Sequence, residues 1–351
     1  MPIRAVGAIL PVALATLSSL AAGAEIPRTP SGRPDFTGTY DIATLTPYER
    51  DPQHGDKLYL DAELARRIEE AAAARMAQAN APSDPERGAP AKGANVDRRS
   101  YDAFWLDPGT TRFAIDGTHR TSILFDPPNG RLPALSEAGE KRRALLRPRA
   151  YRNTGTAWWL ETGEDPYDDP DGMSLLDRCL YLGAVTVPIR PVVYNNLKTI
   201  VQTDTHVVIL IEWMHWARVI RLDSRHLPSD LRSLAGDSIG WWEGDTLVVE
   251  TTNFLERPGV PREGLRALER FTPIDGNTLR YGFTVHDPDH AAPYSGELPW
   301  PKTSARSYEY ACHEGNYSLA NTLRGARQLE REWYELHGAA EAAPESPKAT
   351  N

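Results

Sequence analysis

Apolar and polar residues alternate with a period of two through much of the second half of the chain. Two pairs of these segments flank short turn sequences, Glu-Gly-Asp at 243–245 and Pro-Ile-Asp-Gly-Asn at 273–277, which are typical of β-hairpins. The predicted strands are Thr199–Gln202, Val207–Leu222, Ser238–Trp242, Thr246–Phe254, Arg270–Thr272, Thr278–Val285 and Ser307–Ala311. Because no helical pattern separates most of them, we predict a mainly β fold with a few peripheral helices. Its strands form an antiparallel meander, closed into a lipocalin-like barrel or folded as a sandwich.

Helical periodicity is confined to a few segments. Asp61 opens DAELARRIEEAAAARMAQA, where an apolar stripe at every fourth residue predicts a surface helix. Shorter helical patterns cover 137–147 and 318–333. We expect residues 25–100 to form an N-terminal extended segment with this helix and a flexible loop. Residues 101–335 form the β-rich main domain, and 336–351, rich in Ala, Pro and Glu, a disordered tail.

The first 24 residues have the three parts of a secretory signal peptide. Arg4 supplies the basic start, an uncharged apolar run extends from Ala5 to Leu20, and Ala22-Gly23-Ala24 fits a cleavage site before Glu25. The alternative is a membrane anchor, but the run is rich in Ala, Gly and Ser. We therefore expect a periplasmic or secreted protein with no membrane insertion after cleavage.

The amino-acid composition limits the classes of partner that this protein can bind. The net charge is -9 with 39 basic and 48 acidic residues, and removal of the signal peptide, with Arg4 as its one charged residue, makes it -10. An acidic protein is a poor match for nucleic acid or anionic lipid. The 9 Trp and 14 Tyr indicate a pocket for a small-molecule ligand or substrate. Cys179 and Cys312 form either one disulfide or two buried thiols.

The most informative predicted strand is Val207–Leu222, VVILIEWMHWARVIRL. Read as one strand, it places Glu212, Trp216 and Arg218 on one face and Trp213 and His215 on the other. Both faces are largely apolar, so both should be covered, and the ionisable side chains then need partners. Glu212 and Arg218 would lie about 20 Å apart along the strand and cannot pair directly.

These residues supply the candidate chemistry. His215 is the strongest candidate for proton transfer, because its ordinary pKa lies near neutrality; the alternative is a core histidine bonded to a neighbouring strand. The hairpin that follows adds Asp237, Trp241, Glu250 and Asn253. The Glu-Gly-Asp sequence of this hairpin is most simply explained by the needs of the turn, not by a role in a functional site.

Two further clusters raise the question of a metal. Residues 312–317, CHEGNY, bring together His313, Glu314 and Asn316, and 286–290 read HDPDH. Adjacent residues of a strand point apart, so His313 and Glu314 cannot both be ligands from regular β-structure. We predict no cofactor; the alternative is a divalent metal held by His215 with one of these clusters. The sequence contains no HExxH, CxxC, GxSxG or glycine-rich nucleotide loop.

Long motifs identify a resemblance that covers residues 34–319. They include PDFTGTY, RTSILFDPPNGRLP, DRCLYLG, GDSIGWWEGDTLVVETTNF and YEYACHEGNYSL. The chain resembles a large family of secreted bacterial proteins for which no function is settled. All the candidate residues named above, except Trp213 and Trp216, match positions of the family pattern. The chain departs from it at Gly264, before Leu265, where relatives often have His, and at His286-Asp287-Pro288, where Asp-Asp-Pro is usual.

Two functions are the main hypotheses for these residues, and a structural component of the cell envelope without a pocket is a third. The first is an extracytoplasmic enzyme, a lyase, isomerase or hydrolase, that performs acid–base chemistry on a small carbohydrate or plant-derived aromatic compound. The second is a non-catalytic, lipocalin-like binding protein of the cell envelope. The expected catalytic residues are His215, Glu212, Arg218 and Glu250. The expected substrate-binding residues are Trp213, Trp216, Trp241, Asp237, Asn253, His313, Glu314 and Asn316.

Overall fold

The computed structural model describes residues 25–82, 85–86, 88, 106–146, 154–164, 166–183, 186–257 and 260–338. The predicted signal peptide lies outside the described residues, as do most of the predicted tail and part of the loop at 81–95.

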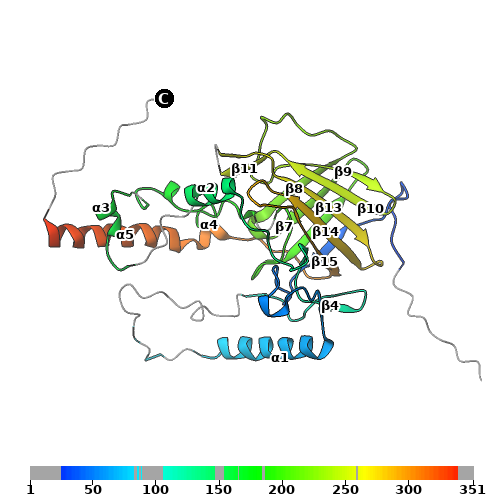
Figure 1. The fold of residues 1–351 in the computed structure, drawn as a ribbon, viewed down its shortest axis with the longest axis horizontal. Helices are drawn as coiled ribbons and strands as arrows, with labels where there is room; N and C mark the ends of the chain where they lie inside the picture. Colours follow the sequence, from blue (N-terminus) through cyan, green and yellow to red (C-terminus); the bar gives the residue numbers. More distant parts are fainter. Residues whose placement is uncertain are drawn as a thin grey trace, which may run out of the picture.

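In this part of the chain, nine strands close into a barrel in which the first strand pairs with the last (Figure 1). The order around the barrel is β1 (Gly38–Asp41), β6 (Leu197–Gln202), β7 (His206–Ile211), β8 (Trp216–Leu222), β9 (Asp237–Glu243), β10 (Thr246–Thr252), β13 (Arg266–Pro273), β14 (Thr278–His286) and β15 (Tyr294–Thr303). The predicted mainly β fold is confirmed, and of the two predicted architectures the barrel is the one formed.

One pair of neighbouring strands departs from the predicted antiparallel meander. β8 and β9 run parallel, with Ile220 opposite Ser238, because the chain between them returns to the end of the barrel at which β8 began. A parallel pair needs such a crossover, which is usually helical. Here residues 223–236 make it without a helix.

Shorter elements lie outside the barrel. β5 (Leu124–Asp126) extends the sheet at β15, β2 (Tyr59–Leu60), β3 (Ala114–Ile115) and β4 (Thr118–Arg120) form a small sheet, and β11 (Phe254–Arg257) pairs with β12 (Val260–Arg262). The α-helices are α1 (Ala62–Ala79), α2 (Glu137–Leu146), α3 (Trp158–Thr162), α4 (Cys312–Gly315) and α5 (Tyr317–His337). The three predicted helices are confirmed. Residues 307–311, predicted as a strand, form neither strand nor helix. No helix in the described ranges is both long and apolar enough to cross a bilayer.

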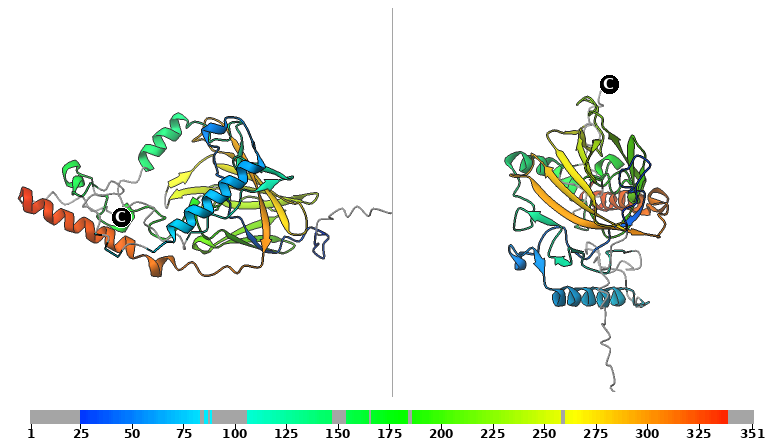
Figure 2. Two further views of the ribbon diagram at one scale, coloured as in Figure 1. Left: turned by 90° about the horizontal axis from the view of Figure 1, so that it is seen from below. Right: turned by 90° about the vertical axis from the view of Figure 1, so that its right-hand side faces the viewer.

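The two ends of the barrel differ. Tight turns at 203–205, 244–245 and 274–277 close one end. The other, which we call the helical end, is where β7 turns into β8 and where β9, β13 and β15 begin. Helices α2, α4 and α5 lie beyond the helical end, and α5 extends away from the barrel (Figures 1 and 2).

The barrel interior is filled with side chains. Tyr40, Phe271, Tyr281 and Trp300 are almost fully buried there, with ring centroids 5.0–6.1 Å apart, within the range in which aromatic pairs stabilise a core. At the helical end the backbone N–H of Ile189 donates to the Tyr281 hydroxyl at 2.8 Å. The segment that follows Thr186 therefore caps this end of the core.

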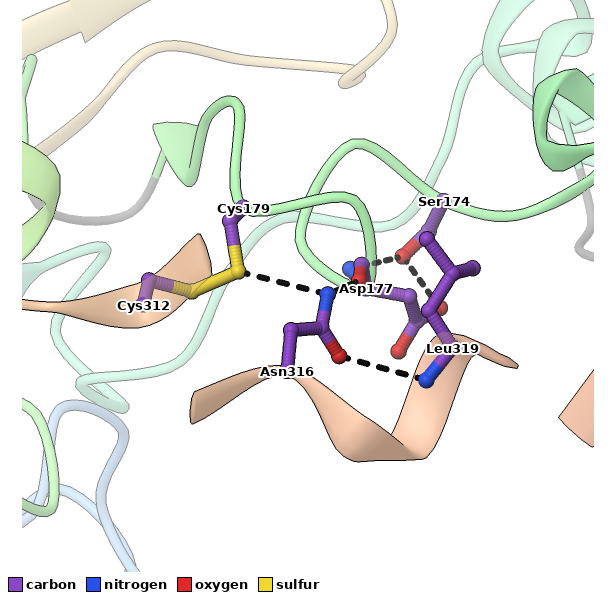
Figure 3. The surroundings of a disulfide bond; sticks show 6 residues. All are labelled: Ser174, Asp177, Cys179, Cys312, Asn316 and Leu319. Carbon is purple, nitrogen blue, oxygen red and sulfur yellow. Dashed lines mark hydrogen bonds between the residues drawn. A yellow bond between two sulfur atoms is a disulfide. The ribbon is translucent and has the colours of Figure 1, made fainter. Parts of the chain in front are cut away.

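A second, smaller core attaches α5 to the rest of the molecule. Trp159 and Tyr167 pack with Met173 and with the α5 residue Ala326. A disulfide between Cys179 and Cys312 ties the loop before β6 to α4 (Figure 3). Beside it, Asn316 donates to the Asp177 carbonyl at 2.7 Å and caps the start of α5. Of the two states considered for the cysteines, the structure has the disulfide.

Candidate functional site

The predicted strand Val207–Leu222 is wrong, and its correction defines the site. The chain forms a hairpin in which Ile211 pairs with Trp216, and residues 212–215 make the turn at the helical end. Met214 and His215 adopt positive φ angles of 55° and 53°, a region that non-glycine residues seldom occupy. The turn thus contains Glu212, Trp213 and His215, which the sequence placed in the middle of a strand.

This turn forms one wall of a cleft with a volume of about 1930 Å³. The other walls come from loop residues around the disulfide, the segment 305–312 and the first four turns of α5. Sites for small molecules usually measure about 300–1,000 Å³. The cleft is therefore large enough for a ligand of several rings.

Three aromatic rings stack where the turn meets the cleft. Trp213 stacks with both of the others: its ring centroid lies 4.4 Å from that of Tyr194 and 5.4 Å from that of Tyr310. All three residues line the cleft. The backbone N–H of Tyr310 donates to Nε2 of His215 at 2.6 Å. His215 therefore fastens the segment carrying Tyr310 to the turn, and the lone pair that a general base would use is occupied.

Carboxyl groups occupy the barrel side of the cleft. Glu212 is buried and accepts long hydrogen bonds from the backbone N–H groups of Leu197 (3.3 Å) and Tyr308 (3.4 Å). Burial raises the pKa of Asp107, and the neighbouring charge of Asp41 raises it further. The wall thus concentrates negative charge on partly desolvated groups.

A lysine lies in the barrel wall behind these acids. Lys198 is 0% exposed, and its Nζ donates only long hydrogen bonds, 3.3 and 3.4 Å, to backbone carbonyls. Burial lowers the pKa of Lys198 from 10.5 to about 7, although the charges of Glu212 and Asp41 act in the opposite direction. Near neutral pH this amine is therefore only partly protonated.

Replacing Lys198 by Met is expected to raise the free energy of unfolding by a few kcal/mol at pH 6 and by much less at pH 10. Below about pH 7 both the folded and the unfolded wild-type chains carry the charge, so the folded state bears its full desolvation cost. Between pH 7 and 10.5 the unfolded chain binds the extra proton, so wild-type stability rises with pH and the difference shrinks. Urea unfolding at several pH values measures this. The exposed Lys141→Met is the control, and a difference independent of pH contradicts the expectation.

Arg218, an expected catalytic residue, lies inside the barrel rather than in the cleft. It is 3% exposed, and Glu269 of β13 is 0% exposed and forms a two-pronged ion pair with it. Its remaining donors bind Ser238 Oγ (3.1 Å), Thr251 Oγ1 (2.7 Å) and the Thr186 carbonyl (3.3 Å). Because its donors are used within the protein, Arg218 serves the core.

Three other expected residues gather elsewhere on the helical end. Asp237 accepts hydrogen bonds from Arg221 (2.7 Å) and His226 (2.8 Å). Burial raises the pKa of Asp237, but the bonds it accepts outweigh burial and the pKa is lowered. Glu250 pairs with Arg266, and its other oxygen lies 3.6 Å from Nε2 of His226.

Asn253, with φ of 57°, donates to the carbonyls of Leu227, Pro228 and Leu231. Asp237 also accepts from the backbone N–H of Leu227 at 3.0 Å. Together these two residues hold the crossover between the parallel strands β8 and β9.

The remaining expected residues are dispersed. Trp216 packs edge-on against Tyr181 beside the turn. Trp241 donates to Glu243 near the opposite end of the barrel. His313 and Glu314 are exposed on helix α4, not at the strand end that the sequence predicted. Of the twelve expected residues, only Glu212, Trp213 and Asn316 line the large cleft. Within the described ranges, no three His, Cys, Asp or Glu side chains are grouped so that they could hold a metal.

Sequence reasoning missed several residues of this region. Lys198 and Glu269 lie two residues from buried apolar side chains on the same face of their strands, as Glu269 does between Ala267 and Phe271. That spacing was a usable sign of inward-pointing charges. Asp41, Asp107 and Tyr194 carried no such sign, because they come from segments without periodic pattern. Comparisons with protein-family models, curated proteins and solved structures find no match, so the function has to be inferred from the cleft itself.

Proposed function

We propose that this protein binds a small organic molecule in the cleft at the helical end of the barrel. The observation that carries the proposal is a cleft of about 1930 Å³ with the aromatic rings of Tyr194, Trp213 and Tyr310 at one wall. Rigid aromatic surface beside a few polar groups is the usual composition of a small-molecule site. Export to the periplasm or the exterior belongs to the same proposal. It is supported by the sequence of residues 1–24 and by the disulfide, which persists in oxidising compartments.

Binding is favoured over acid–base catalysis because the expected catalytic groups are engaged within the protein and lie apart. His215 accepts the Tyr310 N–H, Arg218 is saturated inside the barrel, and Glu250 pairs with Arg266. General acid–base catalysis requires groups within hydrogen-bond reach of one substrate. Glu212 remains at the cleft, so an enzymatic role is an outcome that the following experiment can detect.

The test is a thermal-shift screen of the mature chain with small aromatic compounds and glycosides. A ligand at about 100 times its Kd stabilises the folded state by about 2.7 kcal/mol. Trp213→Leu removes the ring against which both tyrosines stack, so we expect at least tenfold weaker binding. Trp241→Leu, at the far end of the barrel, is the matched control and should keep wild-type affinity.

Two results would count against this proposal. Equal ligand shifts in the Trp213 and Trp241 variants would place the site elsewhere. Mass spectrometry of the recovered ligand decides between the two functions: an unaltered compound supports a binding protein, whereas a converted one supports the enzyme.

A further inference from the structure

The charges around the cleft are unbalanced. Its described lining contains the carboxyl groups of six residues and a single guanidinium, that of Arg306. The six are Asp41, Asp107, Asp177, Glu212, Glu309 and Glu332. A concave surface with one sign of charge focuses its field and attracts ligands of the opposite sign.

The acids on the barrel side are poorly compensated. Among the described residues, neither Asp41, Asp107 nor Glu212 forms an ion pair. Lys198, whose pKa the charges of Glu212 and Asp41 raise, donates from its Nζ to backbone carbonyls and not to a carboxylate. A cation inside the cleft would therefore find carboxylates that form no direct ion pair with a described residue.

The aromatic stack is a second and independent feature of the same wall. Tyrosine rings attract a cation by roughly 0.5–2 kcal/mol, most strongly where water is displaced. Tyr194 and Tyr310 are half-buried and line the cleft beside the acids. The indole Nε1–H of Trp213, a residue only 3% exposed, also has no acceptor among the described residues.

The same observations define the kind of cation. A bare metal ion needs several ligands converging at about 2–2.6 Å, and no such grouping occurs among the described His, Cys, Asp and Glu residues. The cleft is also far larger than an ion requires. A bulky organic cation meets both conditions, because its charge can approach the carboxylates while its rings contact the tyrosines.

We propose that the cleft selects organic cations: amines or quaternary ammonium compounds carried on an aromatic or other flat framework. This inference rests on the proposed function and deepens it by naming the class of ligand. Asp107 and Glu212 would face the positive group, and Tyr194 and Tyr310 would contact the framework.

The test uses three indole probes that differ in the charge of one side chain: tryptamine (positive), tryptophol (neutral) and indole-3-acetate (negative). Calorimetric titration of the full mature chain at low salt is expected to give tryptamine at least a tenfold lower Kd than tryptophol, with indole-3-acetate weakest. Raising the salt concentration should reduce the difference, because exposed charges are screened.

Variants locate the effect. Asp107→Asn should lower the tryptamine-to-tryptophol preference at least threefold, because it weakens the binding of tryptamine more than that of tryptophol. Asp245→Asn, in an exposed turn at the far end of the barrel, is the charge-matched control and should leave the preference intact.

Each other outcome overturns the inference. Equal affinities for the three probes, or tighter binding of indole-3-acetate, would overturn the cation preference and leave the cleft as a binding site. Failure of all three probes, when uncharged compounds in the screen do bind, would have the same meaning. Failure of every compound tested would overturn the proposed function as well.

Discussion

Glu269→Gln is expected to lower the free energy of unfolding by about 3–5 kcal/mol, the range for breaking a buried ion pair from one side. The substitution changes one atom but leaves the Arg218 guanidinium charged, 3% exposed and without its counter-charge. It also weakens the 2.6 Å hydrogen bond that Glu269 accepts from the Tyr281 hydroxyl. Urea unfolding followed by circular dichroism measures the loss.

Two comparisons make the result interpretable. Glu243→Gln, which breaks the exposed pair with Arg270, should cost no more than about 1 kcal/mol. The double variant Arg218→Met with Glu269→Leu removes both charges and should be more stable than Glu269→Gln alone, because no uncompensated charge remains. A loss below about 1 kcal/mol for Glu269→Gln would show that the pair is not what holds this part of the core.

Replacing both Cys179 and Cys312 by Ser is expected to lower the free energy of unfolding by about 5 kcal/mol, the value from loop-closure entropy for so long a loop. The two cysteines are 133 residues apart, and the loop between them contains eight of the nine barrel strands. The cross-link therefore restricts most of the unfolded barrel. Ligand affinity should fall too, because the disulfide lies in the cleft lining.

Reduction supplies the internal control for this prediction. Dithiothreitol should shift the denaturation midpoint of the wild-type chain toward that of the double serine variant and should leave the variant itself unchanged. A wild-type midpoint that does not respond to complete reduction, confirmed by thiol titration, would contradict the expectation.

The mainly β fold of this protein could be predicted because its turns contain residues that strongly favour tight turns. Glu-Gly-Asp and Asp-Gly-Asn favour tight reversals, and the structure has hairpins at both, with Gly244 at φ of 60°. The helix that follows Asp61 could also be predicted, because Asp61 is a favourable N-cap and accepts hydrogen bonds from the backbone N–H groups of Glu63 and Leu64.

The turn at residues 212–215 could not be predicted from the sequence. Met214 and His215 take left-handed backbone angles that usually call for Gly, Asn or Asp, so one uninterrupted strand was the simpler interpretation. Contacts made far along the chain hold this turn, notably the hydrogen bond from Tyr310 to His215. Reading two strands as one also assigned Glu212 and Arg218 to a common face, whereas one side chain lines the cleft and the other fills the barrel core.

Only part of the candidate site could be predicted from the sequence, for a related reason. Its walls come from a strand end, a turn, a disulfide-linked loop and α5, which only tertiary packing brings together. Sequence patterns rank single residues such as His215 by their chemistry, but they contain no information on whether neighbours already satisfy those groups. Asp237 and Asn253 illustrate this, since both are engaged in holding the crossover loop.

Pairing of β1 with β15 determines when the barrel can form during biosynthesis. Thr39 pairs with Thr303 across this seam, 264 positions further along the chain. The barrel can therefore close only after residue 303 has left the ribosome. Until then β1 and the last strand already formed each present an unpaired edge to other chains, a known route to aggregation. Ring closure of such long range is also slow. The nascent polypeptide therefore needs protection until its last strand has emerged.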